Sequence, residues 1–195
     1  MSWTIERRER VAVVTMTTNP VNAQNQAFFA DLHDAFDRLE HDHPDSPVVL
    51  TGTGRRIAVP GDATFGLNEV PIGIPMPAVY VRMLAYAWGG PVAARTSLLG
   101  EIFTPAQAHA LGMVRELVPA NDLLDRAVAI AGQVPEDCLD QYAFTKRACQ
   151  AAALRDIAAL ADPLDTELPQ WMTSEHARHA HRRYWQQLKG RPADW

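Results

Sequence analysis

The feature that most restricts the fold is the order strand, helix, strand near the start of the chain. Residues 11–17 are apolar and β-branched, which predicts a buried strand. Residues 24 to about 41 predict an amphipathic helix with one core face, because apolar side chains recur there at helical spacing. These are Phe28, Phe29, Leu32, Ala35, Phe36 and Leu39. Residues 48–52 predict a second buried strand. A β-α-β order favours parallel pairing and therefore an α/β fold.

The rest of the chain is predicted to be mostly helical. Thr104, Pro105 and Gln107 form a helix-start pattern, with Thr as the cap, Pro first and Gln third, and Gly112 is a suitable end. We also expect a largely buried helix at residues 76–88, helices at about 91–98 and 122–133, and helices from Pro135 onward that break at Pro163 and Pro169. Short strands are expected at residues 57–60 and 114–118.

Size and composition exclude several classes of protein. A chain of 195 residues, 47% hydrophobic and 21% charged, is long enough for one good core. The net charge of −5 argues against nucleic acid as the main partner, because no basic excess is present to neutralise phosphates. No apolar run is long enough to span a membrane, and the first residues do not resemble a secretory signal. We therefore expect a cytoplasmic protein.

Residues 62–75 read Asp-Ala-Thr-Phe-Gly-Leu-Asn-Glu-Val-Pro-Ile-Gly-Ile-Pro and place Glu69 between two turn-forming stretches. Residues 100–114 read Gly-Glu-Ile-Phe-Thr-Pro-Ala-Gln-Ala-His-Ala-Leu-Gly-Met-Val. Together with Asn-Pro-Val-Asn-Ala at 19–23, Val-Leu-Thr-Gly-Thr-Gly at 49–54 and Arg-Ile-Ala at 56–58, these segments resemble, in order, the enoyl-CoA hydratase/isomerase (crotonase) family. The resemblance covers most of residues 1–150.

The resemblance implies a fold, which we expect to be α/β: a shortened crotonase-like ββα spiral with a helical C-terminal region. Residues 1–135 would form the crotonase-like core, shortened near residues 55–56, and residues 136–195 the helical region. Family members pack as trimers, so a homo-oligomer, either a trimer or a hexamer, is expected.

The resemblance also implies an activity, because family members bind acyl-CoA thioesters. Glu69 matches the family carboxylate that transfers a proton or activates water, chemistry that an apolar environment favours. Phe65 lies in the same motif and supplies an apolar neighbour. The resemblance implies no resident cofactor and no metal, because coenzyme A enters as part of the substrate. Without the resemblance, a lone loop glutamate would be interpreted as solvated.

Further substrate-binding candidates follow from the resemblance. Val21 and Ala23 match a turn that lies along coenzyme A in the family, although a simple β-α turn fits equally well. Lys146 matches a position where the family often has a cation for a coenzyme A phosphate. An exposed helical lysine is the favoured alternative for that residue.

The resemblance also indicates a loss. The family stabilises the thioester oxygen with two backbone N–H groups, one from a loop after the Leu-Thr-Gly strand and one from a later Gly-rich loop. Here that strand runs directly into Arg55 and Arg56, which lead into a segment that belongs after the second loop. Both loops are therefore predicted to be absent. Losing each N–H donor would remove about 3–4 kcal/mol of transition-state stabilisation. A non-catalytic binding or assembly protein is the alternative to an enzyme.

The C-terminal region is rich in histidine and arginine. His176, His179 and His181 beside Glu175 suggest a metal, but spacings of three and five do not give the i, i+4 histidine pair of helical zinc sites. A solvated helix is favoured over a metal site. The arginines nearby, with Tyr184 and Trp185, could form a docking face or a phosphate contact, and a solvated helix with two aromatic anchors is favoured over both.

Overall fold

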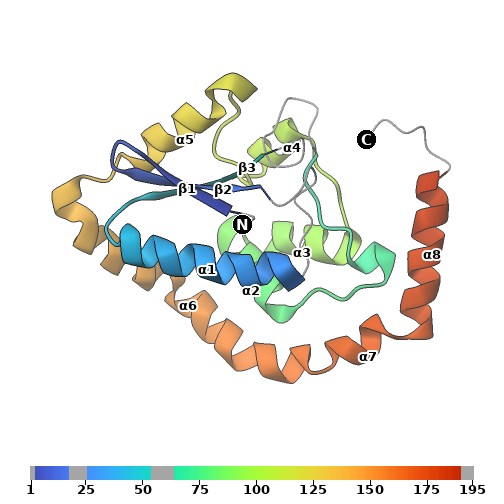
Figure 1. Cartoon of the computed structure of the whole chain (residues 1–195). Helices are drawn as coiled ribbons and strands as arrows, with labels where there is room; N and C mark the ends of the chain where they lie inside the picture. The colour runs from blue at the N-terminus through green and yellow to red at the C-terminus, as the bar shows by residue number, and fades with distance from the viewer. Residues whose placement is uncertain (1–2, 18–25, 54–63, 190–195) are drawn as a thin grey trace. The chain divides into compact units, whose positions relative to one another are not determined.

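The computed structural model describes residues 3–17, 26–53 and 64–189. The described chain forms two compact units (Figure 1). Unit 1 combines residues 1–63 with 117–146, and unit 2 combines residues 64–116 with 147–195. The predicted strand at residues 57–60 and the predicted join at Arg55 and Arg56 lie outside the described residues. The expected division after residue 135 stays a prediction.

Unit 1 is built on a three-stranded sheet with the order β1-β2-β3. Strands β1 (Trp3–Arg8) and β2 (Val11–Met16) are antiparallel, and β2 pairs in parallel with β3 (Val48–Gly52). The helix α1 (Gln26–Asp42) connects the parallel strands. The predicted β-α-β unit and its parallel pairing are therefore confirmed.

Helices cover both faces of this sheet (Figure 1). Ala12 and Val14 face α1, where Phe28 and Leu39 are buried with them. On the opposite face the buried side chains of Val11, Val13 and Val49 pack against α5 (Leu123–Ala131). Successive residues of β2 thus alternate between two apolar layers, as the period of a strand requires. The C-terminal end of unit 1 contains the 3-10 turns η2 (Ala120–Asp122) and η3 (Glu136–Cys138).

Unit 2 contains the candidate motif and most of the helices. Its elements are the 3-10 turn η1 (Val70–Ile72), α2 (Ala78–Trp88), α3 (Gly90–Leu99), α4 (Pro105–Ala110), α7 (Leu168–Met172) and α8 (Glu175–Lys189). The helix α6 (Leu139–Asp165) begins in unit 1 and continues into unit 2. Phe103, Ala108 and Met113 form the buried core of unit 2, and Trp88 and Val92 pack against it.

The start of α4 confirms the predicted cap. The Thr104 side chain accepts a hydrogen bond from the Gln107 backbone N–H at 3.3 Å, and the Gln107 side chain accepts one from the Thr104 N–H at 2.9 Å. Pro105 occupies the first turn, where its missing N–H costs nothing.

Three predictions about unit 2 are wrong. The helix α2 is not largely buried: only Ala78 is buried, and Tyr80, Met83 and Tyr86 are exposed. Residues 114–118 form no strand, because the Met113 and Val114 N–H groups bond to the Ala108 carbonyl at the end of α4 instead of to a ladder. Pro163 lies inside α6 and does not end it.

None of the helices in the described part of the chain combines the length and apolar character needed to cross a bilayer.

Candidate functional site

Glu69 lies at the start of a tight turn. It occupies the N-cap position of η1, where Pro71 follows in the first turn. Its backbone carbonyl accepts hydrogen bonds from the N–H groups of Ile72 at 3.1 Å and Ile74 at 2.8 Å. The backbone on the C-terminal side of Glu69 is therefore fixed by local hydrogen bonds.

The Glu69 side chain is half-buried, and its Oε2 atom is shielded from solvent. This oxygen has no hydrogen-bond partner among the described residues. A shielded polar atom without a partner is costly for stability and needs an explanation, of which a catalytic role is one. The arrangement leaves a carboxylate oxygen available to accept a proton.

Upstream of Glu69, the chain near Phe65 pairs with residues 101–103 as two short strands would. Phe65 and Phe103 exchange two backbone hydrogen bonds of 2.8 and 2.7 Å in an antiparallel bridge. Gly66, next to Phe65, lies very close to residues 101 and 102. A Cβ added at Gly66 would lie 2.3 Å from Ile102 Cδ1 and 2.9 Å from the Glu101 carbonyl oxygen. A side chain at residue 66 would therefore push the two segments apart.

Downstream of Glu69, two more glycines allow close approach. Gly100 adopts φ +62°, and a Cβ there would lie 2.4 Å from Pro71 Cγ. Gly73 adopts φ +85°, and a Cβ there would lie 2.9 Å from both Ala177 Cα and Ala180 Cβ of α8. The turn that carries Glu69 is therefore held between the Gly100 corner and α8.

A polar contact adds to this packing. The Asn68 side-chain amide donates a hydrogen bond of 2.6 Å to the Tyr184 hydroxyl on α8. Ser174 caps α8, since its hydroxyl accepts from the Ala177 N–H at 3.1 Å. The residue before Glu69 is thus tied to the same helix that packs against Gly73.

An ion pair supports residues 100–103 from α3. Arg95 binds Glu101 in a two-pronged contact, with Nε–Oε2 at 2.8 Å and Nη2–Oε1 at 2.5 Å. Its guanidinium also lies 5.6 Å from the centre of the Phe103 ring. The hydrogen bond and charge of Glu101 raise the pKa of Arg95 above its usual value, so Arg95 stays charged. Sequence reasoning missed this pair, because no spacing rule relates Arg95 to Glu101 across a helix end.

The structure groups only some of the predicted site residues. Phe65 and Glu69 lie in one segment of unit 2. Lys146 is exposed on α6 and belongs to unit 1. Val21 and Ala23 lie outside the described residues. Within the described ranges, no three His, Cys, Asp or Glu side chains gather so as to hold a metal ion.

Comparison with known families gives a direct match. The model of the enoyl-CoA hydratase/isomerase family matches residues 55–191, which is more than half of the chain. The chain belongs to the enoyl-CoA hydratase/isomerase family. The match begins at Arg55, where the sequence predicts the join between two family segments. No curated protein matches the chain.

Solved structures share the fold of this hydratase/isomerase family member. Human mitochondrial Δ3-Δ2-enoyl-CoA isomerase is 19% identical to this chain, with a TM-score of 0.80. The aligned region covers 97% of this chain and 98% of the isomerase chain. An enoyl-CoA hydratase/isomerase from Pseudoalteromonas atlantica is 16% identical with a TM-score of 0.80, covering 96% and 98%. A carnitinyl-CoA dehydratase from Mycobacterium avium is 22% identical with a TM-score of 0.77, covering 100% and 99%. The predicted α/β crotonase-like fold is therefore confirmed.

Proposed function

We propose that the protein acts on acyl-CoA thioesters, with Glu69 transferring a proton on an enoyl-CoA. The observation that carries the proposal is the Glu69 carboxylate, whose Oε2 atom is shielded and has no partner among the described residues. Membership of the enoyl-CoA hydratase/isomerase family supports the substrate class.

The proposed chemistry is an isomerisation. Glu69 takes a proton from the carbon next to the thioester carbonyl of a 3-enoyl-CoA, and the electron pair of that C–H bond delocalises over the thioester and the double bond. The carboxylic acid then returns the proton to the far end of the double bond, which gives a 2-enoyl-CoA. One carboxylate suffices for this shuttle. Hydratases of the family carry a second glutamate, in a segment that we predict to be absent from this chain.

The other parts of the proposal concern binding. Phe65 would supply an apolar wall beside the acyl group, and Val21 and Ala23 would lie along coenzyme A. Lys146 would contact a phosphate of that group. Coenzyme A would enter with the substrate and not as a resident cofactor, and the protein would work in cytoplasmic fatty acid metabolism.

The test is turnover by the purified chain. Short and medium 3-enoyl-CoA and 2-enoyl-CoA thioesters are supplied separately, and the products are separated by chromatography. We expect Glu69→Gln to lower turnover by about 100-fold or more, the usual range for removing a general acid–base. Glu40→Gln is a matched control, because Glu40 is exposed on α1. Equal activity in Glu69→Gln and the unchanged chain would refute the role of Glu69.

A second candidate function is a non-catalytic protein that keeps the assembly surfaces of the family. The predicted loss of both oxyanion loops favours it, as does a family match that starts at the predicted join. A folded protein that binds acyl-CoA or assembles, but converts neither substrate, would support this alternative.

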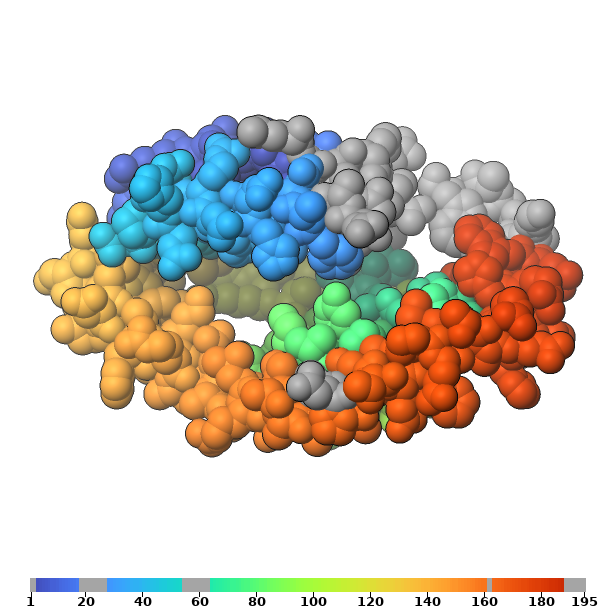
Figure 2. Space-filling view, turned by 60° about the horizontal axis from the view of Figure 1, so that its bottom comes forward, coloured from blue at the N-terminus to red at the C-terminus, as the bar shows by residue number. Residues whose placement is uncertain are grey.

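Both candidates include a homo-oligomer, which we propose to be a trimer or a hexamer. Large apolar side chains are exposed in both units, including Leu99 at 70% and Phe144 at 68%. Figure 2 shows α6 and α7, in orange, with their side chains at the surface, and Leu154 and Trp171 on these helices are more than half exposed. Apolar side chains that gather into contiguous exposed patches are typical of interaction sites, and we propose that these side chains form subunit contacts. Sedimentation equilibrium would give the mass, and a monomer at micromolar concentration would contradict the proposal.

A further inference from the structure

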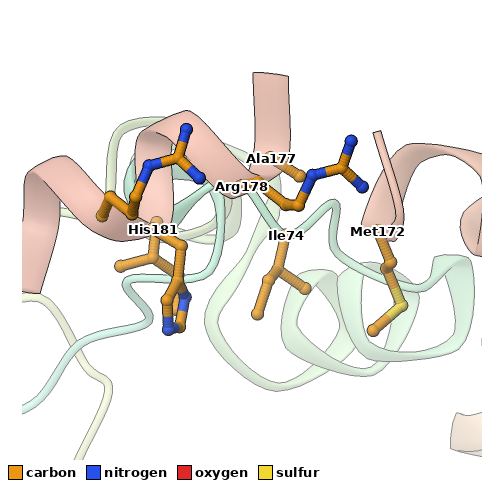
Figure 3. A pocket seen from close by; sticks show the side chains of 7 residues that line it. Ile74, Met172, Ala177, Arg178 and His181 are labelled. Atoms are coloured by element: carbon orange, nitrogen blue, oxygen red, sulfur yellow. The ribbon is translucent and has the colours of Figure 1, made fainter. Parts of the chain in front are cut away.

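A pocket lies in unit 2 between the end of η1 and the helices α7 and α8. Its cavity volume is about 320 Å³. Figure 3 shows the side chains of Ile74, Met172 and His181 extending to one side, whereas the Arg178 guanidinium extends to the other side of the helix edge. Glu69 is not among the lining residues, although its backbone carbonyl accepts hydrogen bonds from the N–H groups of Ile72 and Ile74, which do line the pocket.

The lining divides into an apolar part and a basic part. Ile72, Ile74, Met172 and Ala177 supply the apolar part. Arg178 supplies the basic part together with His181 and Arg182, which lie three and four residues further along α8 and therefore one turn away. No acidic side chain appears among the described residues that line the pocket.

The basic groups are arranged as donors. Arg178 Nη1 donates to the Thr173 carbonyl at 2.6 Å, which uses one of its five N–H groups and holds the side chain beside α7. His181 Nε2 accepts from the Trp185 indole N–H at 2.6 Å. Because the indole nitrogen is only a donor, the proton of neutral His181 lies on Nδ1, which becomes a further donor.

We propose that this pocket binds an amphiphilic anion, an aliphatic chain that ends in a carboxylate. The apolar walls would hold the chain, and Arg178 and Arg182 would hold the carboxylate, which matches a guanidinium in geometry and charge. At about 30 Å³ per water-sized group, the cavity has room for on the order of ten heavy atoms. An eight-carbon fatty carboxylate has that size.

Octanoate is the probe, and its binding to the full chain is measured by ligand-observed NMR and isothermal titration calorimetry. 1-Octanol carries the chain without the charge, and acetate carries the charge without the chain. We expect octanoate to bind more tightly than either, because only octanoate uses both parts of the pocket. Octanol binding as tightly as octanoate, or no octanoate binding, would overturn the proposal.

Variants separate the two parts of the pocket. The double variant Arg178→Gln/Arg182→Gln should weaken octanoate roughly tenfold, at a few-fold for each exposed charge pair, and leave octanol unchanged. Arg155→Gln is the matched control, because Arg155 is exposed on α6 in the same unit and does not line the pocket. Unchanged octanoate affinity in the double variant would refute the anion contact.

A pocket-filling variant tests the location. Met172 is 52% exposed, so Met172→Trp can fill the pocket without disturbing a core. We expect it to abolish octanoate binding with an unchanged circular dichroism spectrum, and full binding would place the ligand elsewhere. Lipid bilayers are a second source of the same chemistry. Pelleting with phosphatidylglycerol vesicles without binding of free octanoate would replace the proposed ligand with a membrane surface.

Discussion

The close approach of Gly73 to α8 is one of the contacts that hold the turn carrying Glu69. Replacing Gly73 with alanine adds a Cβ 2.9 Å from Ala177 Cα and from Ala180 Cβ. Both neighbouring atoms are held by the helix itself, so neither can turn away. The backbone at residue 73 also has φ +85°, in the left-handed region that disfavours a side chain.

Three contributions set the size of the effect on the free energy of unfolding. The left-handed conformation costs about 1–2 kcal/mol for a residue with a Cβ. Forcing a methyl group into a packed contact costs about 1–3 kcal/mol. The reduced entropy of the unfolded chain returns about 0.4–1 kcal/mol. We therefore expect Gly73→Ala to destabilise the protein by about 1–5 kcal/mol.

Gly112→Ala is the matched control in the same unit. Gly112 has φ +74°, and a Cβ there would meet nothing within 4 Å, so this variant carries the backbone cost without the contact. Urea unfolding followed by circular dichroism gives both free energies. The difference between the two variants should be about 1–3 kcal/mol, which is the contact alone. Equal destabilisation by the two variants would refute the inference that η1 is packed tightly against α8.

Other predictions use the same unfolding assay. Asp165→Ala should lower the free energy of unfolding by about 1 kcal/mol, because Asp165 Oδ1 accepts a hydrogen bond of 2.8 Å from the Ala78 N–H at the start of α2. An unchanged free energy of unfolding would mean that water replaces this bond. Thr104→Ala should also lower the free energy of unfolding by about 1 kcal/mol. Thr104→Ser should lower it much less, because the serine hydroxyl retains the cap with Gln107. Equal losses in the two variants would contradict the cap. Phe103→Ala should cost about 3–5 kcal/mol, since Phe103 is 1% exposed in the core of unit 2, and a loss below 1 kcal/mol would contradict that burial.

Sequence patterns predicted the elements whose signals are local. The helical spacing of apolar residues predicted the inner face of α1, and Phe28, Ala35 and Leu39 of that set are buried. The prediction was wrong for Phe29 and Phe36, which are exposed. The strand β1 was not predicted, because most of its residues are polar and exposed and it pairs on one side only. Apolar composition also misled at α2, where Tyr80 and its neighbours remain exposed, since an apolar residue is not necessarily a buried one.

The candidate site divides in the same way. Its central residue, Glu69, follows from a motif that is contiguous in sequence. The contacts that hold Glu69 in place do not, because Gly73 meets Ala177 and Asn68 meets Tyr184 only after α8 has folded back. The C-terminal helix appeared to be a solvated basic helix, yet it also supports the turn that carries the candidate carboxylate. No local pattern marks small residues such as Ala177 as contact points.

The support of Glu69 and the predicted loss of the oxyanion loops are independent. Every contact described for the Glu69 segment comes from residues 64–116 or 147–189, whereas the predicted join lies at Arg55 and Arg56. A chain without those loops can therefore still hold the carboxylate in place. Glu69→Gln should then lower turnover without the loss of stability expected for Gly73→Ala, a variant that also displaces the turn carrying Glu69. Turnover, and not folding, decides between an enzyme and an assembly protein with the same fold.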